Sequence, residues 1–122
     1  MENIKKNLIG KALTVLLIIL CVSFVGCSEV KKTYYESGAL KSEVPFKKGE
    51  FEGPGKFYYE SGALKIEVLY KNGKQEGPGK RYYESGALKA EGTFKNGKKE
   101  GLDKEYYESG KLKKTGTFEK GS

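Results

Sequence analysis

The sequence contains no histidine and no tryptophan, and its 122 residues include only two cysteines and three prolines. Histidine is the side chain that most often acts as a general base near neutral pH. Histidine and cysteine are also the usual protein ligands of transition metals. Without histidine, no serine of the chain has an imidazole neighbour to activate it. These absences argue against an enzyme, and we expect neither a metal ion nor a cofactor.

Acidic side chains are plentiful, so composition alone leaves a catalytic pair of carboxylates open. The glutamates, however, alternate with lysines along the chain. Such alternation is typical of a solvated surface on which opposite charges face each other, and we expect Lys56 to face Glu67 and Lys80 to face Glu91. Exposed pairs of this kind contribute ~0.2–1 kcal/mol each. We interpret the glutamates as surface residues.

Both cysteines lie near the N-terminus. Three lysines precede an apolar run from Ala12 to Val22, and Gly26 stands directly before Cys27. The run is short for a membrane span, which needs roughly 20 residues. The arrangement resembles a bacterial lipoprotein signal, which implies that residues 1–26 are a signal peptide and that Cys27 becomes the lipidated first residue of the mature chain.

An uncleaved N-terminal anchor helix is the alternative. Either interpretation predicts a membrane-anchored protein of the cell envelope that faces outside the cytoplasm. Cys21 leaves with the signal peptide and Cys27 carries lipid, so no disulfide is expected even in an oxidising compartment. Residues 27–33 then form a lipidated tether.

The charge balance is basic, with 23 lysines and arginines against 16 acidic residues. Removing the signal peptide leaves 20 basic and 15 acidic side chains, spread along the whole mature chain. This surplus suits attraction to anionic phospholipid or cell-wall polymer. Nucleic acid is not expected as a partner, because an exported lipoprotein seldom meets it and glutamates interrupt every basic cluster.

The rest of the chain is a repeated unit. The pentapeptide Tyr-Tyr-Glu-Ser-Gly recurs every 24 residues, starting at Tyr34, Tyr58, Tyr82 and Tyr106. A fixed period of this length is the signature of a stacked repeat architecture. We divide the mature fold into four repeats, at residues 34–57, 58–81, 82–105 and 106–122.

Each repeat has the pattern of a β-hairpin. Apolar residues alternate with mostly polar ones from Leu64 to Tyr70, which is typical of a half-buried strand. Asn72-Gly73 is a strong signal for a two-residue hairpin turn, and Ser61-Gly62 is a weaker turn signal. The predicted fold is all-β: a single elongated, curled antiparallel sheet of stacked β-hairpins.

Two-residue turns at both places predict a register. Across the Asn-Gly turn, Val68 would lie opposite Gly77 and Ile66 opposite Gly79. Across the Ser-Gly turn, Tyr59 would lie opposite Leu64 and Phe57 opposite Ile66. One face of the sheet would then be apolar and the other polar. The predicted apolar face holds Phe57, Tyr59, Leu64, Ile66, Val68, Tyr70 and Tyr83. The predicted polar face holds Tyr58, Lys65, Glu67, Glu76, Lys80 and Tyr82.

Glycines and prolines add further expectations. Gly53, Gly55, Gly77 and Gly79 fall on the apolar face, where a neighbouring ring could lie over the bare backbone. Pro54 and Pro78 predict a bulge or break within 53–55 and 77–79, whereas Leu102-Asp103 in the third repeat should pair more regularly. The turns also predict that neighbouring repeats step by two residues, so either the sheet is tilted and curled or one turn is longer.

The polar face is the candidate binding surface. The predicted register places a tyrosine opposite a lysine in successive repeats: Tyr58 opposite Lys65, Tyr82 opposite Lys89 and Tyr106 opposite Lys113. In a purely structural interpretation, the lysine stem covers the ring. In a functional interpretation, exposed rings flanked by ammonium groups could hold a glycan or an anionic headgroup, with weak contacts multiplied over the repeats. The candidate residues are Tyr58, Lys65, Lys80, Tyr82, Lys89, Tyr106 and Lys113.

The repeat motif carries a resemblance. Tyr-Tyr-Glu-Ser-Gly-Ala-Leu-Lys, followed by Tyr-Lys-Asn-Gly-Lys-Gln-Glu-Gly at residues 70–77, resembles the MORN repeat in the variant found in bacterial YwqK-type antitoxin or immunity proteins. The resemblance covers residues 34–121. It implies an elongated sheet of stacked hairpins that serves as a binding or scaffolding surface, and it supplies no catalytic residues.

We therefore expect a lipid-anchored binding or scaffolding protein whose partner is another envelope or secreted protein, including an immunity-type partner for a toxin. The alternative is direct binding of anionic phospholipid or cell-wall polymer through the Tyr/Lys face, and a third possibility is a structural spacer. Weak self-association through edge strands is also expected, although Lys111, Lys113 and Lys114 blunt the C-terminal edge.

Overall fold

The computed structural model describes residues 28–120, which contain nine β-strands. The predicted signal peptide and Cys27 lie outside the described residues. None of the residues from 28 to 120 belongs to a helix long and apolar enough to cross a membrane. The strands are β1 (Glu29–Tyr34), β2 (Leu40–Lys47), β3 (Glu50–Phe51), β4 (Gly53–Tyr58), β5 (Leu64–Lys71), β6 (Lys74–Tyr82), β7 (Leu88–Lys95), β8 (Lys98–Tyr106) and β9 (Leu112–Phe118).

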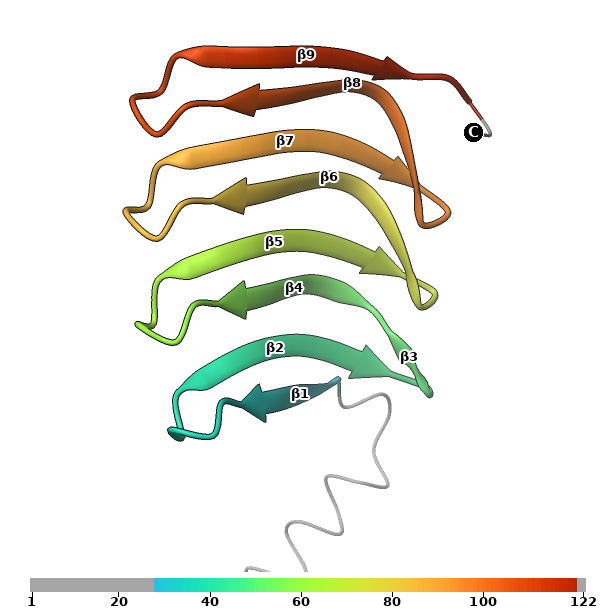
Figure 1. Cartoon of the computed structure of the whole chain (residues 1–122). Helices are drawn as coiled ribbons and strands as arrows, with labels where there is room; N and C mark the ends of the chain where they lie inside the picture. Colours follow the sequence, from blue (N-terminus) through green and yellow to red (C-terminus); the bar gives the residue numbers. More distant parts are fainter. Residues whose placement is uncertain (1–27, 121–122) are drawn as a thin grey trace, which may run out of the picture.

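All strands belong to one antiparallel sheet, in the order β1-β2-β4-β5-β6-β7-β8-β9, with the short β3 paired to β2. Figure 1 shows the strands bowed and stacked from β1 at the bottom to β9 at the top, with hairpin turns alternating between the two sides. Each strand pairs with its neighbour in sequence, as hairpin connections require. The predicted all-β sheet of stacked hairpins is confirmed.

The Asn-Gly turns have the predicted geometry. Lys71 pairs with Lys74, and the two residues between them, Asn72 and Gly73, have φ values of 50° and 76°. Positive φ at both central positions is the requirement of a type I′ turn. Lys48-Gly49 and Asn96-Gly97 make the same turn.

Beyond this turn, the predicted register is wrong. Val68 lies opposite Gly79 and Ile66 opposite Arg81, because the register shifts between Val68 and Tyr70. Gly77 lies in this bulge with φ of 91°, a conformation that favours glycine. The shift amounts to two residues, so every side chain keeps the face that the alternation predicted.

The third repeat contains the same bulge, which contradicts the expectation that it would pair more regularly. Thr93 pairs with Glu100 and Glu91 with Lys104, so the register again shifts by two residues. This repeat has Leu102 where the others have proline, but it keeps a glycine of positive φ at Gly101 (φ 76°). The bulge therefore follows the glycine and not the proline.

The Ser-Gly turn is longer than two residues. The Tyr59 N–H donates to the Ala63 carbonyl (2.8 Å) and the Gly62 N–H to the Tyr59 carbonyl (2.9 Å), which makes a three-residue loop. The predicted pairing of Tyr59 with Leu64 is thus wrong, and Tyr58 takes that position. A second irregularity beside Tyr58 then restores the predicted pairing of Phe57 with Ile66.

These corrections remove the predicted step between repeats. Lys56 pairs with Glu67, and Glu67 pairs with Lys80, so equivalent residues two strands apart differ by one full period of 24. The bulge at Gly77 removes the step by itself, because the irregularity beside Tyr58 offsets the longer Ser-Gly turn. Equivalent side chains of successive repeats therefore form straight rows across the sheet.

Within residues 28–120, the apolar face packs without a second layer. Val44, Val68 and Ala90 are the buried apolar residues, with 6, 5 and 4% of their surface exposed. The Phe94 ring lies over Gly79, where a Cβ would meet it at 2.7 Å, and the Tyr70 ring covers Gly55 in the same way at 2.8 Å. The expected cover of strand glycines by aromatic rings is thus present at these two positions. Gly53 and Gly77 instead provide the positive φ of the bulges.

Candidate functional site

The polar face carries a row of alternating charges that crosses the sheet from β1 to β8. Each lysine in the row lies opposite a glutamate on a neighbouring strand, and the predicted pairs of Lys56 with Glu67 and Lys80 with Glu91 are present. We call it the charged row. Its members are Lys32, Glu43, Lys56, Glu67, Lys80, Glu91 and Lys104.

The first tyrosines of the second and fourth repeats hydrogen-bond to this row and do not pair with the predicted lysines. The Tyr58 hydroxyl donates to Glu43 Oε1 (2.6 Å) and the Tyr106 hydroxyl to Glu91 Oε1 (2.7 Å). Tyr58 lies opposite Leu64, so the predicted pairing with Lys65 is wrong. The longer turn is the cause, because it moves each lysine out of register.

The same correction applies to the next two repeats. Tyr82 lies opposite Leu88 and Tyr106 opposite Leu112, in place of the predicted Lys89 and Lys113. The lysines instead stand over the second tyrosine of each repeat. The ammonium groups of Lys65, Lys89 and Lys113 lie 5.2, 5.2 and 5.7 Å from the ring centres of Tyr59, Tyr83 and Tyr107.

The second tyrosines tie neighbouring repeats together. The Tyr35, Tyr59 and Tyr83 hydroxyls donate to the backbone carbonyls of Tyr58, Tyr82 and Tyr106, at 2.7, 2.8 and 2.9 Å. The structure therefore divides the candidate residues into two groups. Tyr58, Tyr82, Tyr106 and Lys80 share the polar face, whereas Lys65, Lys89 and Lys113 pack on structural tyrosines at the Ser-Gly turns. A binding role for the candidate residues of both groups stays a prediction.

The carboxylates raise the pKa of the row's tyrosines. The hydrogen bond to Glu43, with burial and the charges of Glu43 and Glu67, raises the pKa of Tyr58 from 10.0 to about 12. The hydrogen bond to Glu91 is the main reason that the pKa of Tyr106 is raised. Burial is the main cause for Tyr82, whose pKa is also raised by Glu67. These phenols stay protonated donors beside carboxylates.

Alkaline pH should therefore destabilise the fold in a defined window. An unfolded tyrosine ionises near pH 10, whereas folded Tyr58 keeps its proton to about pH 12, so its contribution to stability is complete below pH 10 and is lost as pH rises through the folded pKa. We expect the denaturation midpoint of the wild-type chain to fall more steeply between these values than that of Tyr58→Phe. Tyr107→Phe is the control, and parallel curves for wild type and Tyr58→Phe would contradict the prediction.

Sequence reasoning missed an apolar row beside the charged row. Leu69 and Leu102 expose 40 and 52% of their surface on the polar face. Pro54 pairs with Leu69, and Pro78 with Thr93 on the following strand. Two shallow hollows of about 230 and 170 Å³ lie along this row. The sequence did contain the signal, because Leu69 occupies a polar position in the alternating strand.

Lysines also gather at the Asn-Gly turns near the C-terminal end of the stack, around a hollow of about 380 Å³ that Glu100 also lines. The Asn96-Gly97 turn is hydrogen-bonded to residues that follow the preceding Asn-Gly turn. The Gly97 N–H donates to the Gln75 carbonyl (2.9 Å), and the Asn96 N–H donates to Glu76 Oε2 (2.9 Å). We call this group the lysine cluster. It consists of Lys74, Lys95, Lys98, Lys99 and Lys120.

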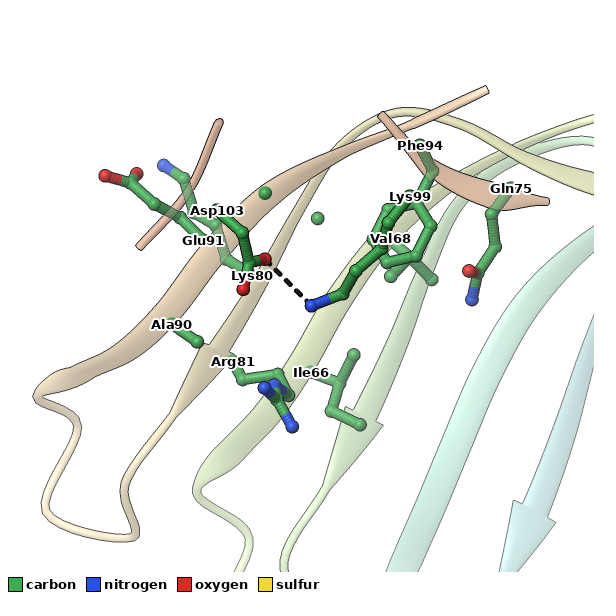
Figure 2. A pocket seen from close by; sticks show the side chains of 12 residues that line it. Ile66, Val68, Gln75, Lys80, Arg81, Ala90, Glu91, Phe94, Lys99 and Asp103 are labelled. Carbon is green, nitrogen blue, oxygen red and sulfur yellow. Dashed lines mark hydrogen bonds and ion pairs between the residues drawn. The ribbon is translucent and has the colours of Figure 1, made fainter. Parts of the chain in front are cut away.

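The apolar face has a hollow of its own, of about 240 Å³, shown in Figure 2. Val68, Ala90 and Phe94 line it together with charged side chains. Lys99 Nζ and Asp103 Oδ1 form an ion pair at 2.8 Å, drawn as a dashed line. The space is smaller than the roughly 300 Å³ at which small-molecule pockets begin, so it suits a single side chain of a partner.

Between residues 28 and 120, no group of three or more histidine, cysteine or acidic residues could hold a metal ion. What the described surface offers is rows of donors, acceptors and apolar side chains on a stacked sheet.

Comparison with known proteins supplies one match. The family model described as a MORN repeat variant matches residues 30–48, 51–72, 75–96 and 99–120, which together make up more than half of the chain. Each of the last three matches contains a Tyr-Glu-Ser-Gly turn and the strands on either side of it. No curated protein and no solved structure matches the chain.

Proposed function

Because the chain belongs to the MORN repeat variant family, we propose that it is a non-catalytic scaffold that binds a protein partner at the cell envelope. MORN repeats generally mediate protein or membrane interactions. In this proposal Cys27 carries the lipid that anchors the chain to the membrane, and the polar face of the sheet receives the partner.

The exposed leucines carry the proposal. Leu69 and Leu102 lie on a face that is otherwise polar, and no second layer of the described residues covers them. Exposed apolar side chains rimmed by charged ones are typical of protein-binding surfaces. The charged row beside them presents both signs at a fixed spacing, which would set the position of a partner with complementary charges.

Replacing both leucines with glutamate tests this surface. We expect the double variant Leu69→Glu/Leu102→Glu to fold like the wild type, because both side chains are exposed, and to lose the partner. The tagged full-length chain is purified from the envelope of its own cells, and each copurifying protein is quantified. A partner recovered equally by wild type and double variant would contradict the proposed surface.

The control places the same charges elsewhere. Ser37→Glu/Ser109→Glu adds two glutamates at exposed Ser-Gly turns, away from the polar face. We expect this variant to retain the partner. Loss of the partner by both variants would mean that added negative charge, and not the leucine row, is responsible.

An immunity function is a narrower form of the proposal. The resemblance to YwqK-type immunity proteins suggests a toxin as the partner, and an envelope location would limit this to toxins that act outside the cytoplasm. Rescue of toxin-treated cells by the wild-type chain, but not by Leu69→Glu/Leu102→Glu, supports this form. Equal rescue by both chains counts against it.

The lysine cluster favours a second candidate function, which is direct binding of anionic phospholipid or cell-wall polymer. Five lysines surround one hollow, with a single glutamate among its lining residues. The cluster lies on the side of the sheet where β1 begins, since Glu29 pairs with Phe46 next to the first lysine-rich turn. A membrane anchor preceding β1 would therefore bring this side toward the headgroups. Binding of this kind is reversed by salt.

A further inference from the structure

The two outer strands of the sheet are its least covered part. Every residue of β1 is exposed, and so are most residues of β9. Within residues 28–120, each of these strands has a single neighbouring strand along the main order of the sheet. Large exposed apolar side chains concentrate there, in β1 or in the last hairpin. They are Val30, Tyr34, Tyr107, Leu112 and Phe118.

The 24-residue period makes these two edges complementary. β1 occupies the place in its repeat that β4, β6 and β8 occupy in theirs, and β9 corresponds to β5 and β7. A β9 edge beside a β1 edge therefore reproduces the junction between β5 and β6. We propose that β9 of one copy of this chain pairs antiparallel with β1 of a second copy, so that the stack continues from molecule to molecule.

The register of this contact follows from the internal junction. Ile66 pairs with Arg81, Glu67 with Lys80 and Val68 with Gly79. The equivalent pairs between two copies are Lys114 with Thr33, Thr115 with Lys32, and Gly116 with Lys31. None of them places two like charges directly opposite each other, which would be unfavourable. A Cβ on Gly116 would meet no atom within 4 Å, so this strand leaves room for a neighbour.

Tyr107 gives independent support. In the three preceding repeats, the second tyrosine donates its hydroxyl to the first tyrosine's carbonyl in the next repeat. Within the part of the chain that the structure describes, Tyr107 contacts Lys113 through its ring and its hydroxyl has no acceptor. In the proposed contact, the Tyr34 carbonyl of the second copy stands where that acceptor is needed.

The contact is head-to-tail and does not close on itself, so it produces chains of molecules. One strand pair is a small interface, and small interfaces are weak and concentration-dependent. Both edges also carry lysines, at 31 and 32 on β1 and at 113 and 114 on β9. Their repulsion is screened by salt, so association should increase with ionic strength, opposite to binding of an anionic surface.

Two variants of the full-length chain, each with one added cysteine, test the contact. Thr115→Cys and Lys32→Cys are mixed in detergent solution, oxidised, and separated by size without reducing agent. We expect the mixed sample to give several-fold more cross-linked dimer than either variant alone, because only a head-to-tail contact brings position 115 beside position 32. Wild-type chain, which retains Cys21 and Cys27, gives the background.

The other outcomes overturn the proposal. If Thr115→Cys alone gave as much cross-linked dimer as the mixed sample, the contact would be a symmetric pairing of two β9 strands. If Lys32→Cys alone did so, the contact would be a symmetric pairing of two β1 strands. No dimer above background would mean that the edges do not pair.

A second readout is Tyr107→Phe in the Thr115→Cys chain. It should lower the yield of cross-linked dimer in the mixed sample while leaving the denaturation midpoint unchanged. An unchanged yield contradicts the assigned hydrogen bond.

Discussion

Replacing Lys74, Lys95, Lys98 and Lys120 with glutamine should weaken binding to vesicles of anionic phospholipid by about a thousandfold. Each lysine near such a surface contributes about 1 kcal/mol, and these contributions add when the side chains reach the same headgroup layer. All four line one hollow. Lys99 is left in place because it pairs with Asp103. The measurement is sedimentation of a chain starting at Ser28, which lacks the predicted anchor, over a series of lipid and salt concentrations.

A matched variant separates position from net charge. Replacing Lys32, Lys56, Lys80 and Lys104 with glutamine removes the same number of charges from the charged row, where each lysine lies opposite a glutamate. We expect this variant to sediment nearly as well as the wild type. Equal losses in both variants would show that overall charge drives binding. A loss confined to the charged-row variant would instead favour the polar face.

Replacing Gly79 with valine should lower the free energy of unfolding by about 2–3 kcal/mol, as overpacking of a tight site does. The new Cβ would lie 2.7 Å from the Phe94 ring and 3.4 Å from the Val68 side chain. The ring would have to leave the backbone that it covers, and the buried Val68 would become exposed. Urea denaturation followed by circular dichroism measures the change.

Gly116→Ala is the control for this substitution. Gly116 also lies in a strand, outside the positive-φ region, but a Cβ there would meet no atom within 4 Å. We expect stability to be unchanged or slightly increased, because alanine reduces the freedom of the unfolded chain. Equal urea midpoints for Gly79→Val and Gly116→Ala would show that the Phe94 ring does not need a glycine beneath it to keep its position.

The sequence predicted the fold because its signals are local. The alternation from Leu64 to Tyr70 sets the two faces, and Asn72-Gly73 marks a turn that few other residues could make. The prediction that rings cover glycines also held at Gly55 and Gly79. The assignment of faces on either side of the bulge near Gly77 was correct, since this bulge shifts the pairing by an even number of residues. It failed for Lys65 beside the Ser-Gly turn, which packs on Tyr59.

The pairing errors had one source, which is the conformation of glycines outside the Asn-Gly turns. Gly62 closes a three-residue loop and Gly77 a bulge, both with positive φ. A glycine in a sequence permits positive φ but does not require it. Treating both turns as two-residue therefore placed Lys65 opposite Tyr58 and missed the glutamate partners of the tyrosines, which come from the preceding repeat.

The sequence by itself determined the 24-residue period, the hairpins and the division into two faces, because each depends on neighbours only a few residues apart. Only the tertiary structure decided which side chains stand in the same row. The hydrogen bond of Tyr58 to Glu43, the exposure of Leu69 and the gathering of lysines around one hollow all depend on how one repeat aligns with the next. That alignment is the sum of loop lengths and bulges along the chain, so an extra residue in one turn changes the contacts between repeats unless a bulge offsets it, as the one beside Tyr58 does.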